Sequence, residues 1–256
     1  MRVAICCKGV PINPGFESVS IVNGDIHYKD TDFYINEFDA YALEAALFFK
    51  NSYKAETIAL TVGPLRAQEV LYIALAKGID QVLRIDGETS RPEFIAAGLI
   101  PALKEINPQL ILVGVQSEDW MGAEVGVYLA QGLNMALAYA VIEICELKGT
   151  QIRIKKEIGG GRKAEVILRL PAILCVQSGI QPLRYVSAIK RQKARNHPIK
   201  LWGKLDFEKV SQIICGMGAY EIRDVSIPSR EGLAEMITGD RTEMAKRLLD
   251  IVTKAI

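Results

Sequence analysis

Arg2-Val-Ala-Ile-Cys-Cys-Lys8 decides the fold, together with Ile35-Asn-Glu-Phe-Asp39, which opens a helical periodicity that runs to Lys50. The first stretch is apolar and ends in a lysine, which is typical of a buried strand in a parallel sheet. Asn36 and Asp39 stand three residues apart, which is the spacing of a helix capping box. A buried strand followed by a capped helix is how an α/β domain builds a nucleotide cradle at its strand ends.

Composition sets the class of protein. The 256 residues are 50% hydrophobic and 24% charged, which suits one large domain with appendages. A net charge of +1 argues against a nucleic-acid binder, which needs a basic stripe. The five cysteines form no C-x-x-C and are joined by only two histidines, so we expect reduced core cysteines and no zinc or iron–sulfur site. We find no charged-then-apolar leader and no apolar run near the roughly 18 residues of a membrane span, so we expect a cytoplasmic protein.

Strand and helix patterns alternate between Val3 and Leu133. Continuous apolar runs predict parallel strands covered on both faces. Apolar residues at helical spacing between them predict helices, so the whole region predicts a doubly wound, mostly parallel α/β sheet. The strands are expected at Val3–Cys7, Thr57–Val62, Gln81–Ile85 and Leu110–Gly114, and the helices at Asn36–Lys50, Pro64–Gly78, Pro92–Ile106, where Pro101 should kink or interrupt the helix, and Ala123–Leu133.

The pattern changes near residue 138, where short β patterns joined by glycine turns predict an antiparallel sheet that extends or caps the parallel core. After Pro182 cations crowd a segment with few apolar residues, and a closing helix is expected at Thr242–Ala255. We therefore divide the chain into a nucleotide-binding domain, 1–183, and a basic recognition segment with a C-terminal arm, 184–256, that packs on a partner. The β patterns are Tyr139–Cys145, Gln151–Glu157, Ala164–Leu170 and Ala172–Val176, with turns at Lys148-Gly149 and Gly159-Gly-Gly161.

An ordered series of motifs along nearly the whole chain resembles the beta subunit of electron transfer flavoproteins. Val3–Val10 resembles the first strand of that family with its V-K-x-V ending, and Ile35–Ala46 resembles its N-P-F/Y-D/C-x-x-A-L/V-E-x-A helix opening. Each piece alone is weak, but their order is specific. The other pieces are Thr61-Val-Gly-Pro64 and Ala74–Asp80, for G-P and A-L-A-x-G-A-D; Gly114–Gly126, for G-K/R-Q-A-I-D-x-D-T-x-Q-x-G; Leu170–Val176, for L-P-A-V-V-T-V; and Pro182–Tyr185, for E-P-R-Y.

The resemblance implies an electron carrier whose α/β sheet is of the adenine-nucleotide alpha-hydrolase type. Such a subunit pairs with a larger alpha subunit that holds most of the electron-transferring FAD. The pair carries electrons between a flavin-dependent dehydrogenase of the acyl-CoA type and a quinone reductase or another acceptor. The beta subunit's own pocket holds AMP, or a second FAD in members that bifurcate electrons from NADH. The flavin supplies the redox chemistry, and the protein binds and orients it.

The resemblance also implies the cofactor site. Cys6 stands at the strand end beside adenine, and Phe38 either approaches the partner-held flavin or is a core aromatic. Asn36 and Asp39 contact the ligand or serve only as a helix cap. Lys8 faces a phosphate or ends a strand in solvent. The expected site residues are Cys6, Lys8, Asn36, Phe38, Asp39, Val62, Gln116, Ser117, Asp119, Gly122, Ala123, Glu124, Val125 and Gly126.

The loop at residues 116–126 departs from the family pattern. Asp119 is kept, but Trp120-Met-Gly122 and Glu124 replace the second acid, the threonine and the glutamine. Gly122 still allows close backbone approach to a phosphate. Glu124 opposes a phosphate unless Lys8 or a partner residue compensates its charge. The alternative is a plain connection whose acids only favour the helix N-terminus.

A second departure lies in the segment that docks the dehydrogenase. Ala188 stands where the family has an exposed leucine, with Ile189 beside it. One apolar anchor ringed by cations suits a transient complex and suggests an unusual dehydrogenase partner, whereas the alternative is a basic surface strand against solvent or the alpha subunit. The expected docking residues are Arg184, Tyr185, Ala188, Ile189, Lys190, Arg191 and Lys193.

Two other classes share this α/β layout. ATP-pyrophosphatases and nucleotidyl transferases rely on a serine- and glycine-rich loop after the first strand, which Lys8–Pro14 lacks. A nucleotide-sensing module of the universal-stress type has no need of a basic arm at 184–200 or a long C-terminal extension. The flavin colour of the purified protein separates these classes from a flavoprotein.

Overall fold

The computed structural model describes residues 1–12, 18–22, 25–29, 31–87, 89, 91–205, 225–227 and 236–255. The chain divides into two compact units, Met1–Arg223 and Asp224–Ile256. The described part of the second unit holds one helix, α7 (Arg241–Ala255), at the place expected from the sequence. None of the helices in the described ranges is long and apolar enough to cross a membrane.

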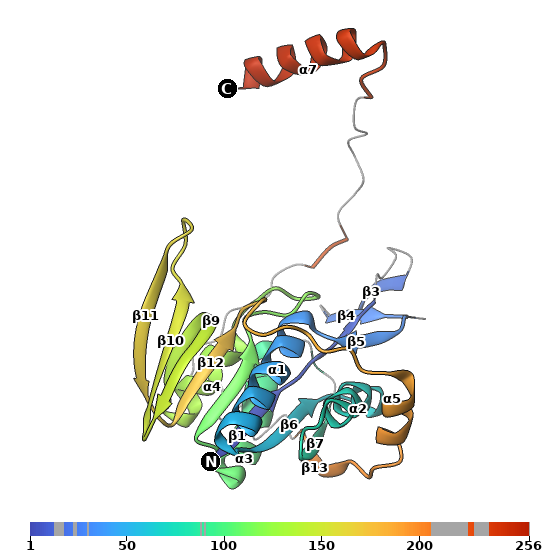
Figure 1. Ribbon diagram of the computed structural model, residues 1–256. Helices are drawn as coiled ribbons and strands as arrows, with labels where there is room; N and C mark the ends of the chain where they lie inside the picture. Colours follow the sequence, from blue (N-terminus) through green and yellow to red (C-terminus); the bar gives the residue numbers. More distant parts are fainter. Residues whose placement is uncertain are drawn as a thin grey trace. The chain divides into compact units, whose positions relative to one another are not determined.

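The centre of the first unit is a nine-stranded sheet with the strand order β11-β10-β9-β12-β8-β1-β6-β7-β13 (Figure 1). Neighbours from β9 to β13 pair in parallel, which confirms the expected doubly wound sheet. The strands are β1 (Arg2–Cys6), β6 (Glu56–Val62), β7 (Gln81–Asp86), β8 (Leu110–Gly114), β9 (Ala136–Lys148), β10 (Gln151–Glu157), β11 (Lys163–Arg169), β12 (Ala172–Val176) and β13 (Lys200–Lys204).

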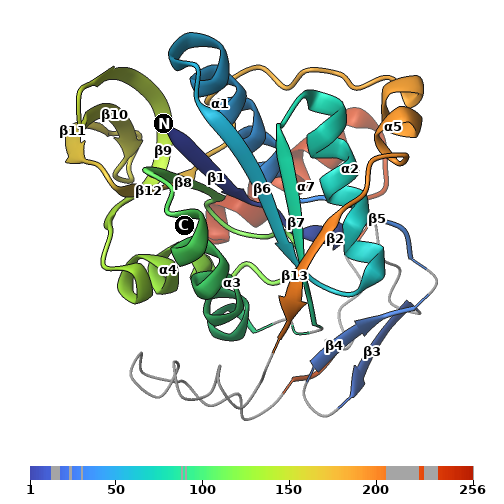
Figure 2. The same ribbon diagram turned by 90° about the horizontal axis from the view of Figure 1, so that it is seen from below.

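Helices cover both faces of the sheet (Figure 2). Alternate residues of β1 explain why: Val3 and Ile5 join one core cluster, whereas Ala4 and Cys6 join another. The first cluster packs against α1 (Glu37–Tyr53) and α2 (Gln68–Lys77), and the second against α3 (Pro92–Ile106) and α4 (Val125–Leu133). The inner residues of β1, β6, β7 and β8 are therefore buried on both faces, as the apolar runs predict.

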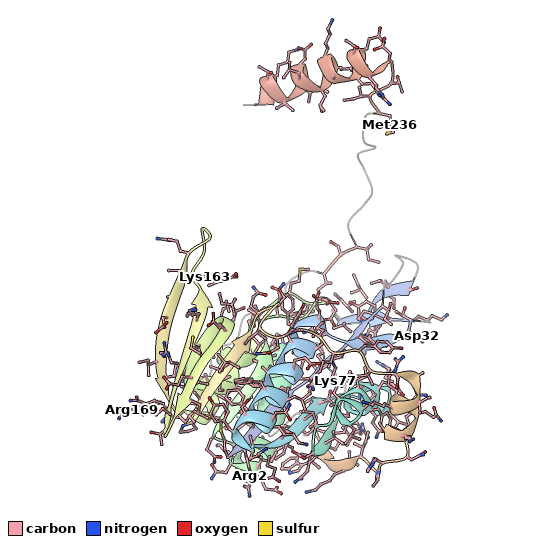
Figure 3. The ribbon with its side chains drawn as sticks, viewed as in Figure 1. Arg2, Asp32, Lys77, Lys163, Arg169 and Met236 are labelled. Atoms are coloured by element: carbon pink, nitrogen blue, oxygen red, sulfur yellow. The ribbon has the colours of Figure 1, made fainter. Side chains whose placement is uncertain are left out.

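The antiparallel part of the sheet is smaller than expected. Within this sheet only the two pairings of β10, with β9 and with β11, are antiparallel, and Gly159, Gly160 and Gly161 have positive φ in the hairpin between β10 and β11. Figure 3 shows Lys163 and Arg169 at the two ends of β11, on the outer edge of the sheet. The expectation that β12 belongs to an antiparallel sheet is wrong, because all five of its residues are buried and it pairs in parallel with β8 and β9.

Several helix boundaries differ from the sequence prediction. α4 begins at Val125 and not at Ala123, because Ala123 has a φ of 59°, in the left-handed region. A short 3₁₀ turn, η2 (Leu65–Ala67), precedes α2. α3 continues through Pro101, so the expected interruption is absent from this helix.

Three features were not foreseen from the sequence. After β1 the chain forms two small antiparallel ribbons, β2 (Gly9–Pro11) with β5 (Phe33–Ile35) and β3 (Val19–Val22) with β4 (Asp25–Tyr28). Further along, α5 (Ala188–Ala194) packs against α2, and β13 joins the edge of the sheet beside β7.

Gly126 brings α4 close to the sheet. A Cβ atom at Gly126 would lie 2.3 Å from the Cys175 Sγ and 3.0 Å from the Val113 Cγ2. We predict that Gly126→Ala lowers the free energy of unfolding by about 1–3 kcal/mol through overpacking, although alanine favours helices. Urea denaturation followed by circular dichroism measures the change. Gly203→Ala, where a Cβ meets nothing within 4 Å, is the matched control and should cost much less.

Candidate functional site

A cavity of about 460 Å³ opens at the carboxyl ends of the central strands, where strand order reverses. β1 leads towards α1 on one face of the sheet and β8 leads into α4 on the other, so the chain diverges between these neighbouring strands. Ligands of doubly wound α/β proteins bind at such a reversal.

Twelve of the residues expected at a cofactor site line this cavity. Phe38 and Gly126 do not line it, and Gly126 instead lies on the side of α4 that faces the sheet. Cys6 lines it with a buried thiol whose pKa burial raises, so this side chain serves as a small apolar surface. The twelve are Cys6, Lys8, Asn36, Asp39, Val62, Gln116, Ser117, Asp119, Gly122, Ala123, Glu124 and Val125.

The expected capping box at the start of α1 is wrong. Asn36 holds the N-cap position, but its side chain makes no capping hydrogen bond. Its Nδ2 donates to the Gln116 carbonyl at 2.8 Å, and its Oδ1 accepts from the Glu118 N–H at 3.2 Å. The buried Asn36 side chain therefore fastens the loop after β8 instead of its own helix.

Asp39 also turns away from its helix. Its two carboxylate oxygens accept the N–H of Lys8 and the N–H of Gly114, each at 2.8 Å. These N–H groups lie where β1 and β8 end, and buried N–H groups must find acceptors. A Cβ on Gly114 would lie 2.5 Å from the Asp39 Oδ1, so the contact requires glycine there. Burial raises the pKa of Asp39 to about 6, although both backbone hydrogen bonds and the charge of Lys8 oppose the rise.

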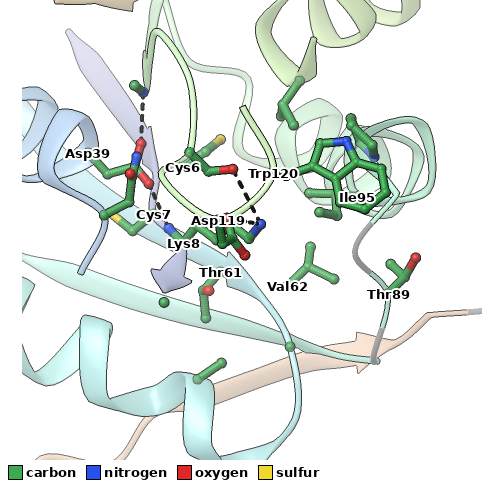
Figure 4. A pocket seen from close by; sticks show the side chains of 18 of the residues that line it. Cys6, Cys7, Lys8, Asp39, Thr61, Val62, Thr89, Ile95, Asp119 and Trp120 are labelled. Atoms are coloured by element: carbon green, nitrogen blue, oxygen red, sulfur yellow. Dashed lines mark hydrogen bonds and ion pairs between the residues drawn. The ribbon is translucent and has the colours of Figure 1, made fainter. Parts of the chain in front are cut away.

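Lys8 is paired within the chain. Its Nζ donates to the Asp119 carboxylate at 2.7 Å and lies 3.4 Å from the Ser117 Oγ (Figure 4). The side chains of Lys8 and Asp119 are 26% and 10% exposed, so the alternative of a strand end in solvent is wrong. A phosphate entering the cavity would share this cation with Asp119.

Glu124 lines the cavity just before α4. The Tyr128 hydroxyl, one turn further along, hydrogen-bonds to this carboxylate, and burial together with the charge of Glu124 raises the pKa of Tyr128. Lys8, one of the two compensating charges considered for Glu124, is paired with Asp119. Glu124 therefore has a partner within its own helix.

The sequence analysis missed one wall of the cavity, which comes from β4, β5 and η2. Tyr28 and Phe33 meet edge to face with ring centroids 6.3 Å apart, and the Arg66 guanidinium lies 5.3 Å from the centre of the Phe33 ring. Arg66 is thus a second cation at the cavity. The only signal for it was its place two residues after Pro64 at the end of a strand.

The expected docking residues divide into two groups. Arg184 is held internally: its Nε donates to the Glu44 Oε2 at 2.7 Å, its backbone N–H donates to the same carboxylate, and its carbonyl accepts from Lys77. Ala188 to Lys193 lie in α5, so the alternative of a basic strand is wrong. The Ser187 hydroxyl caps α5 by accepting the Lys190 N–H. Ile189 and Tyr185 are 70% and 86% exposed.

Four cysteines in the described ranges, Cys6, Cys7, Cys145 and Cys175, are free, and Cys215 lies outside those ranges. Among the residues that the structure describes, no group of three or more His, Cys, Asp or Glu side chains could hold a metal ion.

The sheet and the cavity at its reversal define a doubly wound α/β protein of the kind that binds ligands at its strand ends. Comparison with known proteins gives the family. The electron transfer flavoprotein domain matches residues 26–204. The electron transfer flavoprotein subunit beta of Methylophilus methylotrophus is 31% identical over 227 residues, which cover 86% of each chain. The chain therefore belongs to the electron transfer flavoprotein beta-subunit family, which implies a role in electron transfer and an alpha-subunit partner.

Two relatives with other names are also similar. The caffeyl-CoA reductase-Etf complex subunit CarD of Acetobacterium woodii is 29% identical over 250 residues, covering 93% of this chain and 92% of that protein. Protein FixA of Azorhizobium caulinodans is 27% identical over an alignment that covers 99% of this chain and 94% of that protein.

The buried carboxylate of Asp39 gives a prediction about pH. Its pKa of about 6 exceeds the ordinary 3.8, so between these values the folded chain binds more protons than the unfolded chain. The contribution of Asp39 to the free energy of unfolding is at its maximum below pH 4. It falls by about 2–3 kcal/mol as the pH rises past 6. Asp39→Asn lacks this titration. The difference in unfolding free energy, variant minus wild type, should rise over that pH window.

Asp80→Asn is the control of opposite sign. Burial raises the pKa of Asp80, but hydrogen bonds from Lys50 and Thr57 and the charge of Lys50 outweigh it, so the pKa is lowered. For Asp80→Asn the difference in unfolding free energy, variant minus wild type, should rise only as the pH falls below 4, because the wild type then loses the contribution of the Asp80 carboxylate. Parallel stability profiles for wild type and Asp39→Asn would show that Asp39 does not titrate in this window.

Proposed function

We propose that this chain is the beta subunit of a two-subunit electron transfer flavoprotein that carries electrons from a flavin-dependent dehydrogenase to a quinone reductase or another acceptor. The alpha subunit would hold most of the FAD, and residues 184–256 would form the recognition segment and the arm that packs on it. The observation that carries the proposal is the cavity at the reversal of strand order, in a chain of this family.

The cavity residues fit an adenine nucleotide, AMP or a second FAD. About 460 Å³ lies within the usual range for a cofactor site. Lys8 and Arg66 supply positive charge, and the start of α4 supplies backbone N–H groups and the positive end of a helix dipole. Cys6 and Val62 supply an apolar surface at the strand ends for the adenosine end.

A bound flavin supplies the electron-accepting and electron-donating chemistry, and this chain's residues position it. Asp39 and Asn36 hold the strand ends and the loop at 116–118 in a fixed arrangement. Lys8 and Asp119 set the local charge. None of these side chains has to gain or lose a proton for electrons to pass.

An NADH-linked, electron-bifurcating member of the family is the second candidate. It would hold a second FAD here in place of AMP. The apolar end of the cavity, lined by Val62, Ile95 and Trp120, favours it because a second ring system needs such a surface.

Co-expression with the alpha subunit tests the pairing. We predict a yellow 1:1 complex, and poor solubility or little flavin for this chain alone, because α7 leaves Leu248, Leu249 and Ile251 exposed in its own unit. Chromatography of nucleotide released from the complex should give FAD together with AMP, or FAD alone near two equivalents for a bifurcating member. A colourless complex, or a monomer with full flavin, would contradict the proposal.

Docking of the dehydrogenase is proposed on α5, where Ile189 is ringed by cations. We predict that Ile189→Asp lowers the second-order rate constant for reduction by the dehydrogenase about tenfold, with bound flavin unchanged, because one buried apolar contact anchors a transient complex. Added salt should slow the wild type as charge steering is screened. Ile167→Asp on β11, at the other end of the sheet, is the control, because Ile167 is 60% exposed and so comparable to Ile189. Equal loss in both variants would place docking elsewhere.

A further inference from the structure

The cavity has two ends of different chemistry. One end is polar and holds the Lys8–Asp119 ion pair with Ser117. The other is apolar, and in Figure 4 the indole of Trp120 lies there beside Ile95, on the side of the cavity that also holds Val62. The family pattern that this loop resembles has acids, a threonine and a glutamine, and Trp120 stands within the part of the loop that departs from it.

The loop backbone is shaped around this indole. A Cβ atom at Gly122 would lie 2.7 Å from the Trp120 Cδ1 and 3.0 Å from its Nε1, so the glycine leaves room for the ring. Met121 and Ala123 on either side both have positive φ, at 55° and 59°. Such conformations are unfavourable for residues with a side chain, and they persist where the surrounding structure requires them. Close approach of a phosphate to Gly122 on this side is blocked by the indole.

Trp120 is not an ordinary core aromatic. It is absent from the hydrophobic clusters formed by the described residues, and it lines the cavity with a partly exposed side chain. Trp202 offers the contrast: it packs against the second core cluster, and its Nε1 donates to the Glu105 carboxylate at 2.9 Å. The two tryptophans of this chain therefore have different surroundings.

We propose that the indole of Trp120 is a stacking wall for a planar heteroaromatic ring, adenine or isoalloxazine, bound at the apolar end of the cavity. The inference rests on the proposed function and specifies which part of the nucleotide this end takes. An indole face is a large aromatic surface for a base or flavin ring, and Val62, Ile95 and Leu99 complete an apolar slot. The phosphates then lie towards Lys8, Arg66 and the start of α4.

The stacking role of Trp120 is tested by calorimetric titration of AMP and of riboflavin into the nucleotide-depleted complex of this chain with its alpha subunit. AMP carries adenine without isoalloxazine, and riboflavin carries isoalloxazine without adenine or phosphate. We expect Trp120→Leu to weaken binding of one of them about tenfold, and Trp120→Phe to stay within about threefold of wild type, because the phenyl ring still stacks. The compound that depends on Trp120 identifies the ring. Trp202→Phe should leave both affinities unchanged.

The outcomes separate the inference from the proposed function. Equal affinities in wild type, Trp120→Leu and Trp120→Phe would overturn the stacking wall while leaving a nucleotide site in place. An equal loss in the Phe and Leu variants would also overturn it, because a retained ring would then make no difference. If the wild-type complex binds neither AMP, riboflavin nor FAD, the proposed function fails first. Quenching of Trp120 fluorescence by AMP in the Trp202→Phe background would support stacking on adenine independently of affinity.

Discussion

The rest of the site depends on one carboxylate, that of Asp39. By accepting the N–H groups of Lys8 and Gly114 it joins the ends of β1 and β8, the two strands between which the chain diverges. Asn36, one turn earlier, holds the loop that leaves β8. The first turn of α1 thus fixes three cavity segments at once. Burial of the charge opposes this arrangement, as the raised pKa of Asp39 shows, but two orphaned N–H groups would cost more in its absence.

Buried charged groups around the cavity and beyond it are also paired. Lys8 pairs with Asp119. Glu44, whose side chain is 2% exposed, pairs with Lys77, whose side chain is 7% exposed, and with Arg184. Removing one member of a buried pair is costly, because the other is left uncompensated. A phosphate in the cavity would therefore share Lys8 with Asp119, and backbone N–H groups at the start of α4 would add to its attraction.

Sequence patterns predicted the strands well wherever burial on both faces imposed a continuous apolar run. Leu110–Gly114 and Ala172–Val176 match β8 and β12 to the residue. The patterns failed where local sequence admits two outcomes. Asn36 and Asp39 have the spacing of a cap, but whether they bond their own helix or distant N–H groups is decided by tertiary packing. The ribbons β2 to β5 were missed because they are short, and Arg66 could not be assigned to the cavity without them.

One helix, α2, connects the cavity wall with α5, the proposed docking helix. The turn that leads into α2 places Arg66 in the cavity wall, whereas Lys77 at its last residue holds the Arg184 carbonyl. α5 packs along the same helix, and Arg195 just beyond it pairs with Glu69 near the start of α2. The cavity wall and the proposed docking helix therefore both contact α2. A partner that settles on α5 meets a surface whose position relative to the cavity is set by packing within the chain, independently of the partner.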